Sequence, residues 1–268
     1  CRPDIRAAED PRFSRSIQDG FMKILITNDD SVYAPGIKAL AAALSKVAQI
    51  AVVAPDRERS AVSHALTLHH PLRAVKIAPG RYSVDGTPTD CVNLGIHSLL
   101  DFHPDLVFSG INRGANLGDD VTYSGTVAAA MEATLMGIPA VAISLASLDD
   151  AADYANAAVF AARLAPLVMK NGLPRGTFLN VNVPASGNPL ACPPLVTVQG
   201  KRRYEGTIVD KVDPRGRSYY WIGAADLDFH DVEGSDFAAV KRGHISITPL
   251  HLDMTNHQSI PLLNSWTF

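Results

Sequence analysis

The sequence predicts an α/β protein with a doubly wound, mostly parallel β-sheet and a β-rich C-terminal extension. Short apolar runs, typical of buried strands, alternate with longer segments whose apolar residues recur at helical spacing, as in parallel sheets covered by helices. Beyond residue 184 this alternation stops and short β-type segments follow. We therefore divide the chain into a leading segment (1–21), a Rossmann-like core (22–184) and an extension (185–268).

The first strand–helix–strand unit spans residues 22–54. The run 22–27 (MKILIT) is apolar, as expected for a buried strand, and Pro35 suits the first turn of a helix because its missing N–H costs nothing there. A second apolar run, 49–54 (QIAVVA), follows the helix. Short connections between such elements predict parallel strand pairing and a right-handed crossover.

The same alternation continues to residue 184. Thr87 and Pro88 are typical of the cap and first residue of a helix, which we expect to run to Leu99. Further strands are expected at 105–109, 139–145 and 177–183, and further helices at 124–136 and 151–170. In the extension, the segments 196–198, 218–222 and 244–248 favour strands, and no helix of comparable length is expected.

Composition limits the classes of function. The net charge is −3, from 24 basic and 27 acidic residues, which argues against a broad surface for a nucleic-acid duplex. The three cysteines form no C-x-x-C pair, so we expect a reduced, cytoplasmic protein. No apolar stretch approaches the roughly 18 residues of a membrane span, and we expect no membrane partner. We interpret Met22 as the natural start and residues 1–21 as upstream or non-native sequence.

Asp29 and Asp30 are the first candidates for chemistry. They follow a buried strand directly, and ligands of parallel α/β sheets bind beyond the carboxyl ends of the strands. Two adjacent carboxylates repel each other unless a cation lies beside them, and oxygen ligands suit Mg²⁺ or Mn²⁺. The alternative is that Asp30 caps the next turn and Asp29 is solvated; we favour the metal site.

Two further segments follow the same logic. Residues 109–120 (SGINRGANLGDD) also come after a buried strand, and their glycines allow close approach to a ligand beside the amides of Asn112 and Asn116. This segment could equally be a glycine-rich turn. Ser124, Gly125 and Thr126 open a helix, where free amides and hydroxyls can bind phosphate, although Ser124 can also be an ordinary cap.

Other signals are weaker or missing. Ser60 could reach a metal as a hydroxyl ligand, and His64 is a candidate neighbour of the active site. The sequence has no G-x-x-x-x-G-K-[ST] loop, no G-x-S-x-G elbow, no G-x-G-x-x-G after the first strand and no H-E-x-x-H. These absences argue against a P-loop NTPase, a serine hydrolase with that elbow, a Rossmann dehydrogenase and a zincin.

Taken together, five stretches resemble the SurE family, the stationary-phase survival proteins that act as 5'/3'-nucleotidases. They are ILITNDD with APGI, VVAPDRERSAVSHALTL, GTPTDCVNLG, PDLVFSGINRGANLGDDVTYSGTVAAAMEA and DFAAVKRGHISITPLHLD. The resemblance implies a Rossmann-like core with an extension that exchanges between subunits, and hence a homodimer or homotetramer. It also implies a phosphoric monoester hydrolase that releases phosphate from nucleoside 5'-monophosphates, with 3'-monophosphates and short polyphosphate as further substrates.

The resemblance also assigns roles to residues. It implies that Asp29, Asp30, Ser60 and Asn112 hold one divalent metal, with Asp29, Asp30 and Asn112 catalytic. Asn116 and the segment 124–126 are then expected to line the phosphate pocket. Ser31 departs from the family, which usually has glycine after the acidic pair.

We expect a water molecule to attack phosphorus directly, with Asp29 as the first candidate for the proton acceptor. Two alternatives stay open at this point: a metal-dependent nucleoside ribohydrolase, and a nucleotide-binding stress regulator without catalysis.

Overall fold

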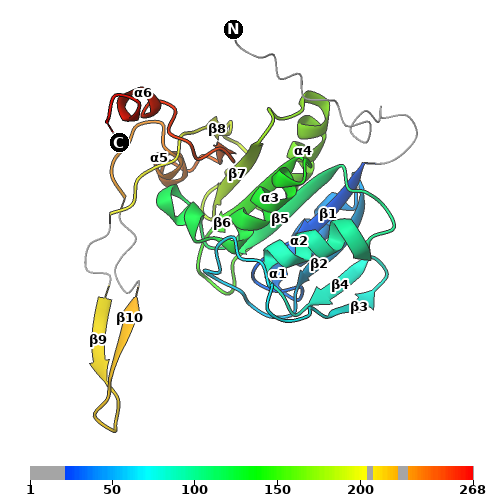
Figure 1. Ribbon diagram of the computed structural model, residues 1–268. Helices are drawn as coiled ribbons and strands as arrows, with labels where there is room; N and C mark the ends of the chain where they lie inside the picture. Colours follow the sequence, from blue (N-terminus) through cyan, green and yellow to red (C-terminus); the bar gives the residue numbers. More distant parts are fainter. Residues whose placement is uncertain (1–21, 204–207, 223–228, 268) are drawn as a thin grey trace.

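The computed structural model describes residues 22–203, 208–222 and 229–267. Its centre is a nine-stranded sheet in the order β3-β4-β2-β1-β5-β6-β7-β11-β8, with a separate two-stranded hairpin (Figure 1). The central strands β1 (Lys23–Thr27), β2 (Gln49–Pro55), β5 (Leu106–Arg113), β6 (Ala140–Ala146) and β7 (Thr177–Pro184) are parallel to one another. The predicted doubly wound α/β fold is confirmed.

Helices cover both faces of the sheet. On one face, α1 (Pro35–Leu44) and α4 (Ala155–Asn171) pack together over a core that includes Ile24 and Phe108. On the other face, α2 (Pro88–Leu94) and α3 (Gly125–Leu135) cover a second core, and a π-helical turn, Gly95–Leu99, follows α2. Burying apolar area in both layers is the main stabilising contribution, at about 25 cal/mol per Å².

The order of the strands places a switch point at β1. The chain leaves β1 for β2 on one side, and β5 later pairs with the other side of β1. Connections therefore diverge above the carboxyl ends of β1 and β5, and such a divergence leaves a crevice at that edge of an open α/β sheet. Asn28, Asp29 and Asp30 follow β1 at this edge.

Several predicted boundaries differ from the structure. The strand expected at 105–109 continues to Arg113, with a register shift between Gly110 and Asn112. A Cβ on Gly110 would lie 2.2 Å from the backbone oxygen of Ile143, so glycine is required for this close approach of two strands. The helix expected at 151–170 begins at Ala155, because residues 149–153 form turns. In these turns, the Asp149 and Asp153 carboxylates accept hydrogen bonds from the backbone two residues later.

Three strands were not predicted: β9 (Ile208–Val212) in the extension and two strands at the edge of the sheet. The hairpin of β3 (Ala74–Ala78) and β4 (Arg81–Val84) extends the sheet beyond β2, with β4 parallel to β2 and β3 antiparallel to β4. Four of the five residues of β3 are exposed, so this edge strand lacks the apolar run that reveals the central strands.

The extension contributes to the same sheet. The strand β11 (Ser246–His251) pairs antiparallel with β7, and β8 (Leu195–Val196) pairs parallel with β11. Two short helices, α5 (Asp236–Lys241) and α6 (Ile260–Leu263), lie beside it. Figure 1 shows the hairpin of β9 (Ile208–Val212) and β10 (Ser218–Ile222) lying away from the sheet. Within the residues described, no helix is long and apolar enough to cross a membrane.

Candidate active site

The acidic pair lies in a tight turn at the end of β1. The side-chain amide of Asn28 donates to the backbone oxygen of Ser31 at 2.9 Å, which closes the turn around Asp29 and Asp30. Asp29 is 4% exposed and Asp30 is partly buried. Ser31 has a φ of +104°, a backbone conformation that favours glycine. The residue that departs from the family pattern therefore stands at a strained position.

The first turn of α3 packs directly against Asp29. The backbone N–H of Thr126 donates to Asp29 Oδ2 at 3.1 Å, and the Thr126 hydroxyl makes a short hydrogen bond to Asp29 Oδ1. A Cβ on Gly125 would lie 3.0 Å from Asp29 Cβ, so glycine allows the helix to approach this closely. The positive end of the α3 dipole and these two donors favour a carboxylate at this point.

Asp30 is held from the opposite side. Its Oδ2 accepts a hydrogen bond from the backbone N–H of Arg113, the last residue of β5, at 3.0 Å. Burial raises the pKa of Asp29, and burial together with the neighbouring Asp29 carboxylate raises the pKa of Asp30 to about 6. The carboxylate of Glu58 also raises the pKa of both groups. Ionising these acids together is unfavourable without a cation, so the site fits a divalent metal ion.

Backbone contacts bring the other two predicted ligands to the acidic pair. Arg59 donates its N–H to the backbone oxygen of Asp29 at 2.7 Å, and Ser60 is the next residue. Asn112 precedes Arg113, whose N–H binds Asp30. The backbone at Ser60 and Asn112 therefore lies near the acidic pair at the carboxyl edge of β1 and β5, and the assignment of all four residues to one metal stays a prediction.

The chemistry of these side chains suits a hard cation. The Asn112 amide nitrogen donates to the Gly114 backbone oxygen at 2.9 Å, and no hydrogen bond from a described residue reaches its Oδ1, the atom a metal would bind. The Ser60 hydroxyl donates to Glu58 Oε1 at 2.7 Å. No group of three or more His, Cys, Asp or Glu residues able to hold a metal occurs in the described part of the chain. A metal here would depend on mixed carboxylate, amide and hydroxyl oxygens, the donors that Mg²⁺ and Mn²⁺ prefer.

The candidate phosphate-binding residues occupy two environments. Ser124 caps α3, where its hydroxyl oxygen accepts from the Val127 N–H at 3.1 Å, and both polar groups of Thr126 bind Asp29. Asn116 is also buried and lies in the loop between β5 and α3. Its side-chain amide donates to the Ser144 hydroxyl at 2.8 Å, and this hydrogen bond involves neither Asp29 nor Asp30. Contact of these residues with phosphate stays a prediction.

Two asparagines of β7 were missed by the sequence analysis. Asn180 and Asn182 both donate side-chain amide hydrogens to the backbone oxygen of Asn116, at 2.8 and 2.9 Å. Asn182 Oδ1 accepts the backbone N–H of Asn116 at 2.8 Å. These bonds fix the loop between β5 and α3. The signal was present as two polar residues at period two within the apolar run TFLNVNV.

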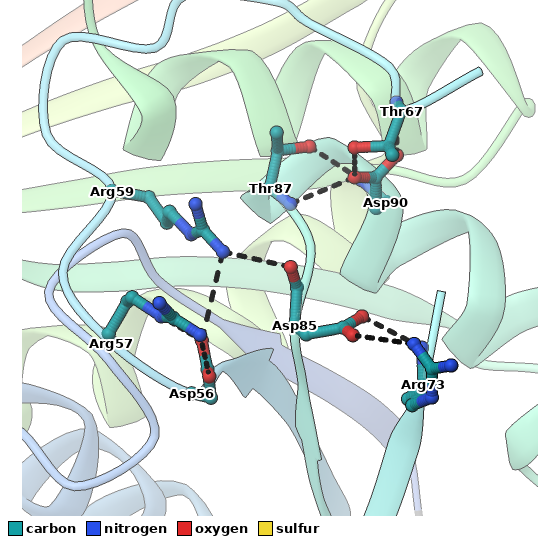
Figure 2. Close-up of polar contacts among 8 residues, drawn as sticks. All are labelled: Asp56, Arg57, Arg59, Thr67, Arg73, Asp85, Thr87 and Asp90. Carbon is teal, nitrogen blue, oxygen red and sulfur yellow. Dashed lines mark hydrogen bonds and ion pairs between the residues drawn. The ribbon is translucent and has the colours of Figure 1, made fainter. Parts of the chain in front are cut away.

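The loop of residues 56–73, which carries Ser60, is tied down beside the site (Figure 2). The Arg59 guanidinium donates to the backbone oxygen of Asp85 at 2.8 Å and lies 3.8 Å from Asp56 Oδ1. Asp85 Oδ1 in turn accepts the backbone N–H of Arg73 at 2.7 Å. Both ends of the loop are therefore anchored to the residue that follows β4.

The middle of this loop is bound to the start of α2. Asp90 accepts hydrogen bonds from the Thr67 hydroxyl at 2.6 Å and from the Thr67 backbone N–H at 2.9 Å (Figure 2). The same carboxylate accepts the Thr87 N–H at 2.8 Å as part of the capping box of α2. One acid thus serves the helix cap and the loop together.

His64 contacts α3, the helix whose first turn binds Asp29. Its Nε2 lies 2.6 Å from Glu132 Oε2, and Glu132 Oε1 accepts the amide of Asn93 from α2 at 2.5 Å. Glu132 is buried in α3, two turns below the residues that contact Asp29. His64 therefore contacts α3 at Glu132, and its role as a neighbour of the active site stays a prediction. Glu132 was missed because a single acid within a helix is usually solvated.

The fold and the site define a class: a doubly wound α/β protein with a buried acidic pair at the switch point, facing a helix N-terminus. The family model "Survival protein SurE" matches residues 24–206. A protein named 5'-nucleotidase SurE from Geotalea daltonii is 68% identical over 245 residues, covering 91% of this chain and 99% of the relative. Its namesake from Geobacter sulfurreducens is 65% identical over 245 residues, covering 91% and 94%.

A solved structure agrees with this match. The crystal structure of SurE protein from Aquifex aeolicus has a TM-score of 0.81 and 43% sequence identity, covering 90% of this chain and 98% of that chain. The chain belongs to the SurE family.

The strained turn at Ser31 yields a first prediction. Ser31→Gly should be more stable than Ser31→Ala by roughly 1–2 kcal/mol, because both lose the hydrogen bond from the Tyr33 N–H but only glycine relieves the positive φ. Urea unfolding of the two purified variants measures the difference. Equal midpoints and slopes would show that this turn carries no strain.

The Glu132 pair yields a second prediction. The hydrogen bond to His64, against the opposing effect of burial, lowers the pKa of Glu132 below its usual 4.5. The folded pKa lies below the unfolded value, so the stabilisation is complete above pH 4.5 and is lost as pH falls through the folded pKa. Glu132→Gln should therefore cost about 1–3 kcal/mol at pH 7, and the difference from the parent should shrink below pH 4.5.

Denaturant unfolding between pH 3 and 7 tests this, with Glu233→Gln as the control because Glu233 is exposed. A difference between Glu132→Gln and the parent that stays constant over the whole range would contradict the assignment.

Proposed function

We propose that this chain is a divalent-metal-dependent 5'-nucleotidase that hydrolyses nucleoside 5'-monophosphates to nucleoside and phosphate. The observation that carries the proposal is the Asp29–Asp30 pair at the end of β1, with the buried Asp29 bound to the first turn of α3. Metal ions and the free amides of a helix N-terminus both bind phosphate, and here the two would lie beside each other. The names of the most similar relatives support the substrate class.

We assign the metal to Asp29, Asp30, Ser60 and Asn112, with Mg²⁺ or Mn²⁺ as the candidate ions. When bound, the ion would neutralise charge on a phosphate oxygen and make a water molecule more acidic. Ser124 and Gly125 would hold the remaining phosphate oxygens at the start of α3. The water oxygen forms a bond to phosphorus while the bond from phosphorus to the ribose oxygen breaks.

The hydrogen bonds also separate the roles of the two acids. Each oxygen of Asp29 accepts a bond from Thr126, which opposes the effect of burial on its pKa and would orient this carboxylate as a ligand. Asp30 Oδ2 accepts one bond, from Arg113, and no hydrogen bond from the described residues reaches Oδ1. We therefore move the proton acceptor from Asp29 to Asp30, which would pass the proton of the attacking water to the departing ribose oxygen.

The wider activities follow from the same geometry. A site open at the edge of the sheet that binds the phosphate group itself would also take 3'-monophosphates and the terminal phosphate of short polyphosphate. A cytoplasmic location stays a prediction from the cysteine pattern.

A homodimer or homotetramer is proposed from the hairpin of β9 and β10. Two-stranded hairpins are marginally stable alone in water, and this one exposes Tyr220, Trp221 and Ile222 by 64% or more. An apolar arm of this kind fits a second copy of the chain.

Asp29→Asn tests the metal assignment. The parent should be stabilised against heat by Mn²⁺ or Mg²⁺, as any ligand of the native state stabilises it, and Asp29→Asn should lose this shift. Its kcat/KM should fall by more than the roughly 100-fold that loss of an outer-shell partner costs. Thermal unfolding and phosphate release are measured together. Asp210→Asn, an exposed acid on β9, is the control and should match the parent.

The assay uses 5'- and 3'-monophosphates with added metal or with chelator, and analyses every product. Phosphate release that chelator abolishes supports the proposal. Release of free base would indicate a ribohydrolase, and binding without any product would indicate a regulator; either result overturns the proposal.

Trp221→Ser tests the hairpin. Its assembly should be smaller than that of the parent, because the side chain is 64% exposed in one chain and would be buried between copies. Light scattering after size exclusion gives the mass of each. Leu167→Ser, which removes an exposed apolar side chain from α4, is the matched control. A monomeric parent, or identical masses for all three proteins, would refute the role of the hairpin.

A further inference from the structure

Asp236 is a fully buried acid that binds backbone rather than a cation. It is the first residue of α5 and is 0% exposed. Its Oδ2 accepts the N–H of Gly118 at 2.8 Å, and its Oδ1 accepts the N–H groups of Gly200 at 2.9 Å and Phe237 at 2.8 Å. No ion pair to it occurs in the described ranges. Burying a carboxylate is unfavourable unless specific hydrogen bonds compensate it, so the position of these three donors is set by one group.

Residues of the extension bind both backbone polar groups of Gly118, its N–H and its C=O. Besides the N–H bond to Asp236, its backbone oxygen accepts the side-chain amide of Gln199 at 3.0 Å. A Cβ on Gly118, whose φ is +53°, would lie 3.0 Å from the Gly200 backbone oxygen. The next residue, Asp119, accepts the Arg202 backbone N–H at 3.0 Å. We call Asp236 and Gln199, with their bonds to Gly118, the Asp236 clamp; the Gly200 N–H binds the same Asp236 carboxylate.

The clamp holds the segment that leads into α3. Gly118 begins the 3₁₀ turn η2 (Gly118–Thr122), which ends next to Tyr123 and the cap Ser124. Inside the turn, the Asp120 N–H binds the Leu117 oxygen and the Tyr123 N–H binds the Asp120 oxygen, both at 3.1 Å. A hydrogen-bonded turn of this length moves as a unit, so a shift of Gly118 becomes a shift of Ser124.

We infer that Asp236 is a positioning residue for the nucleotidase site: through Gly118 and η2 it sets where Ser124 and Gly125 meet the phosphate. The inference rests on the proposed phosphate role of these residues. Asp236 itself touches neither the acidic pair nor the start of α3 in any hydrogen bond. It acts from the extension, outside the residues 22–184 that were expected to contain the catalytic core.

Asp236→Asn in the full-length protein is the direct test. Asparagine keeps the size, but one of its two terminal atoms is an NH₂ group that would face backbone N–H donors. KM for a 5'-monophosphate and the inhibition constant of inorganic phosphate should both rise roughly tenfold or more, with a smaller change in kcat, because phosphate binding depends on placement. Unchanged KM and inhibition constant in a folded variant would overturn the inference.

Ser235→Ala is the matched control. It removes the hydrogen bond from the Ala238 N–H to the Ser235 hydroxyl and so weakens the same helix, by about 1 kcal/mol. It leaves the bonds to Gly118 in place. A loss of thermal stability with parental KM and inhibition constant is expected. If Ser235→Ala raises both constants as much as Asp236→Asn does, the role of Asp236 is merely structural.

Gln199→Ala keeps the inference testable if Asp236→Asn does not fold. Gln199 is at the surface, and the substitution removes one bond to Gly118. A rise of both constants by up to about fivefold is expected; parental values would overturn the inference. The proposed function fails separately, since it requires that the parent itself lose activity with chelator and be inhibited by phosphate.

Discussion

The contact between Asp29 and the first turn of α3 is the interaction on which the site depends. It joins the end of the first strand to a helix that begins nearly a hundred residues later, through both polar groups of Thr126. Gly125 permits the approach, and Asn28 closes the turn that presents the acid. The helix N-terminus thus partly offsets the cost of burying this carboxylate, which suits the metal-ligand role proposed for it. The strand order supplies the location, since β1 and β5 diverge there.

The rest of the fold fixes the two segments that complete this contact. The loop between β5 and α3 is bound at Asn116 by asparagines of β7 and at Gly118 by Asp236. The loop of residues 56–73 is bound to α2 through Asp90 and to α3 through His64. The anchors come from β7, α5, α2 and α3, so the geometry at the acidic pair reflects the packing of several distant elements rather than local sequence.

Residues whose role depends on local sequence could be predicted, and residues whose role depends on distant contacts could not. Asp29, Asp30 and Ser124 stand next to a strand end or a helix start, so local pattern and the rule for parallel sheets identify them. Glu58, Glu132 and Asp236 act over contacts of 39 to 118 residues or through charge alone. Nothing in their neighbours marks such contacts. The edge strand β3 was missed because its residues are exposed and form no apolar run, whereas such runs revealed the five central strands.

Dividing the chain at residue 184 by its sequence pattern separates segments that pair within one sheet. Helix–strand alternation stops at Pro184, yet β11 pairs with β7 along six residues and continues the sheet. From the same extension, Gln199 and Asp236 reach back to Gly118. Periodicity reports which face of an element is buried, not which segment buries it. A core assembled from residues 22–184 alone would leave β7 as an exposed edge and the loop before α3 without its bonds to Asp236 and Gln199, so the extension completes the fold around this loop as well as supplying the proposed contact between subunits.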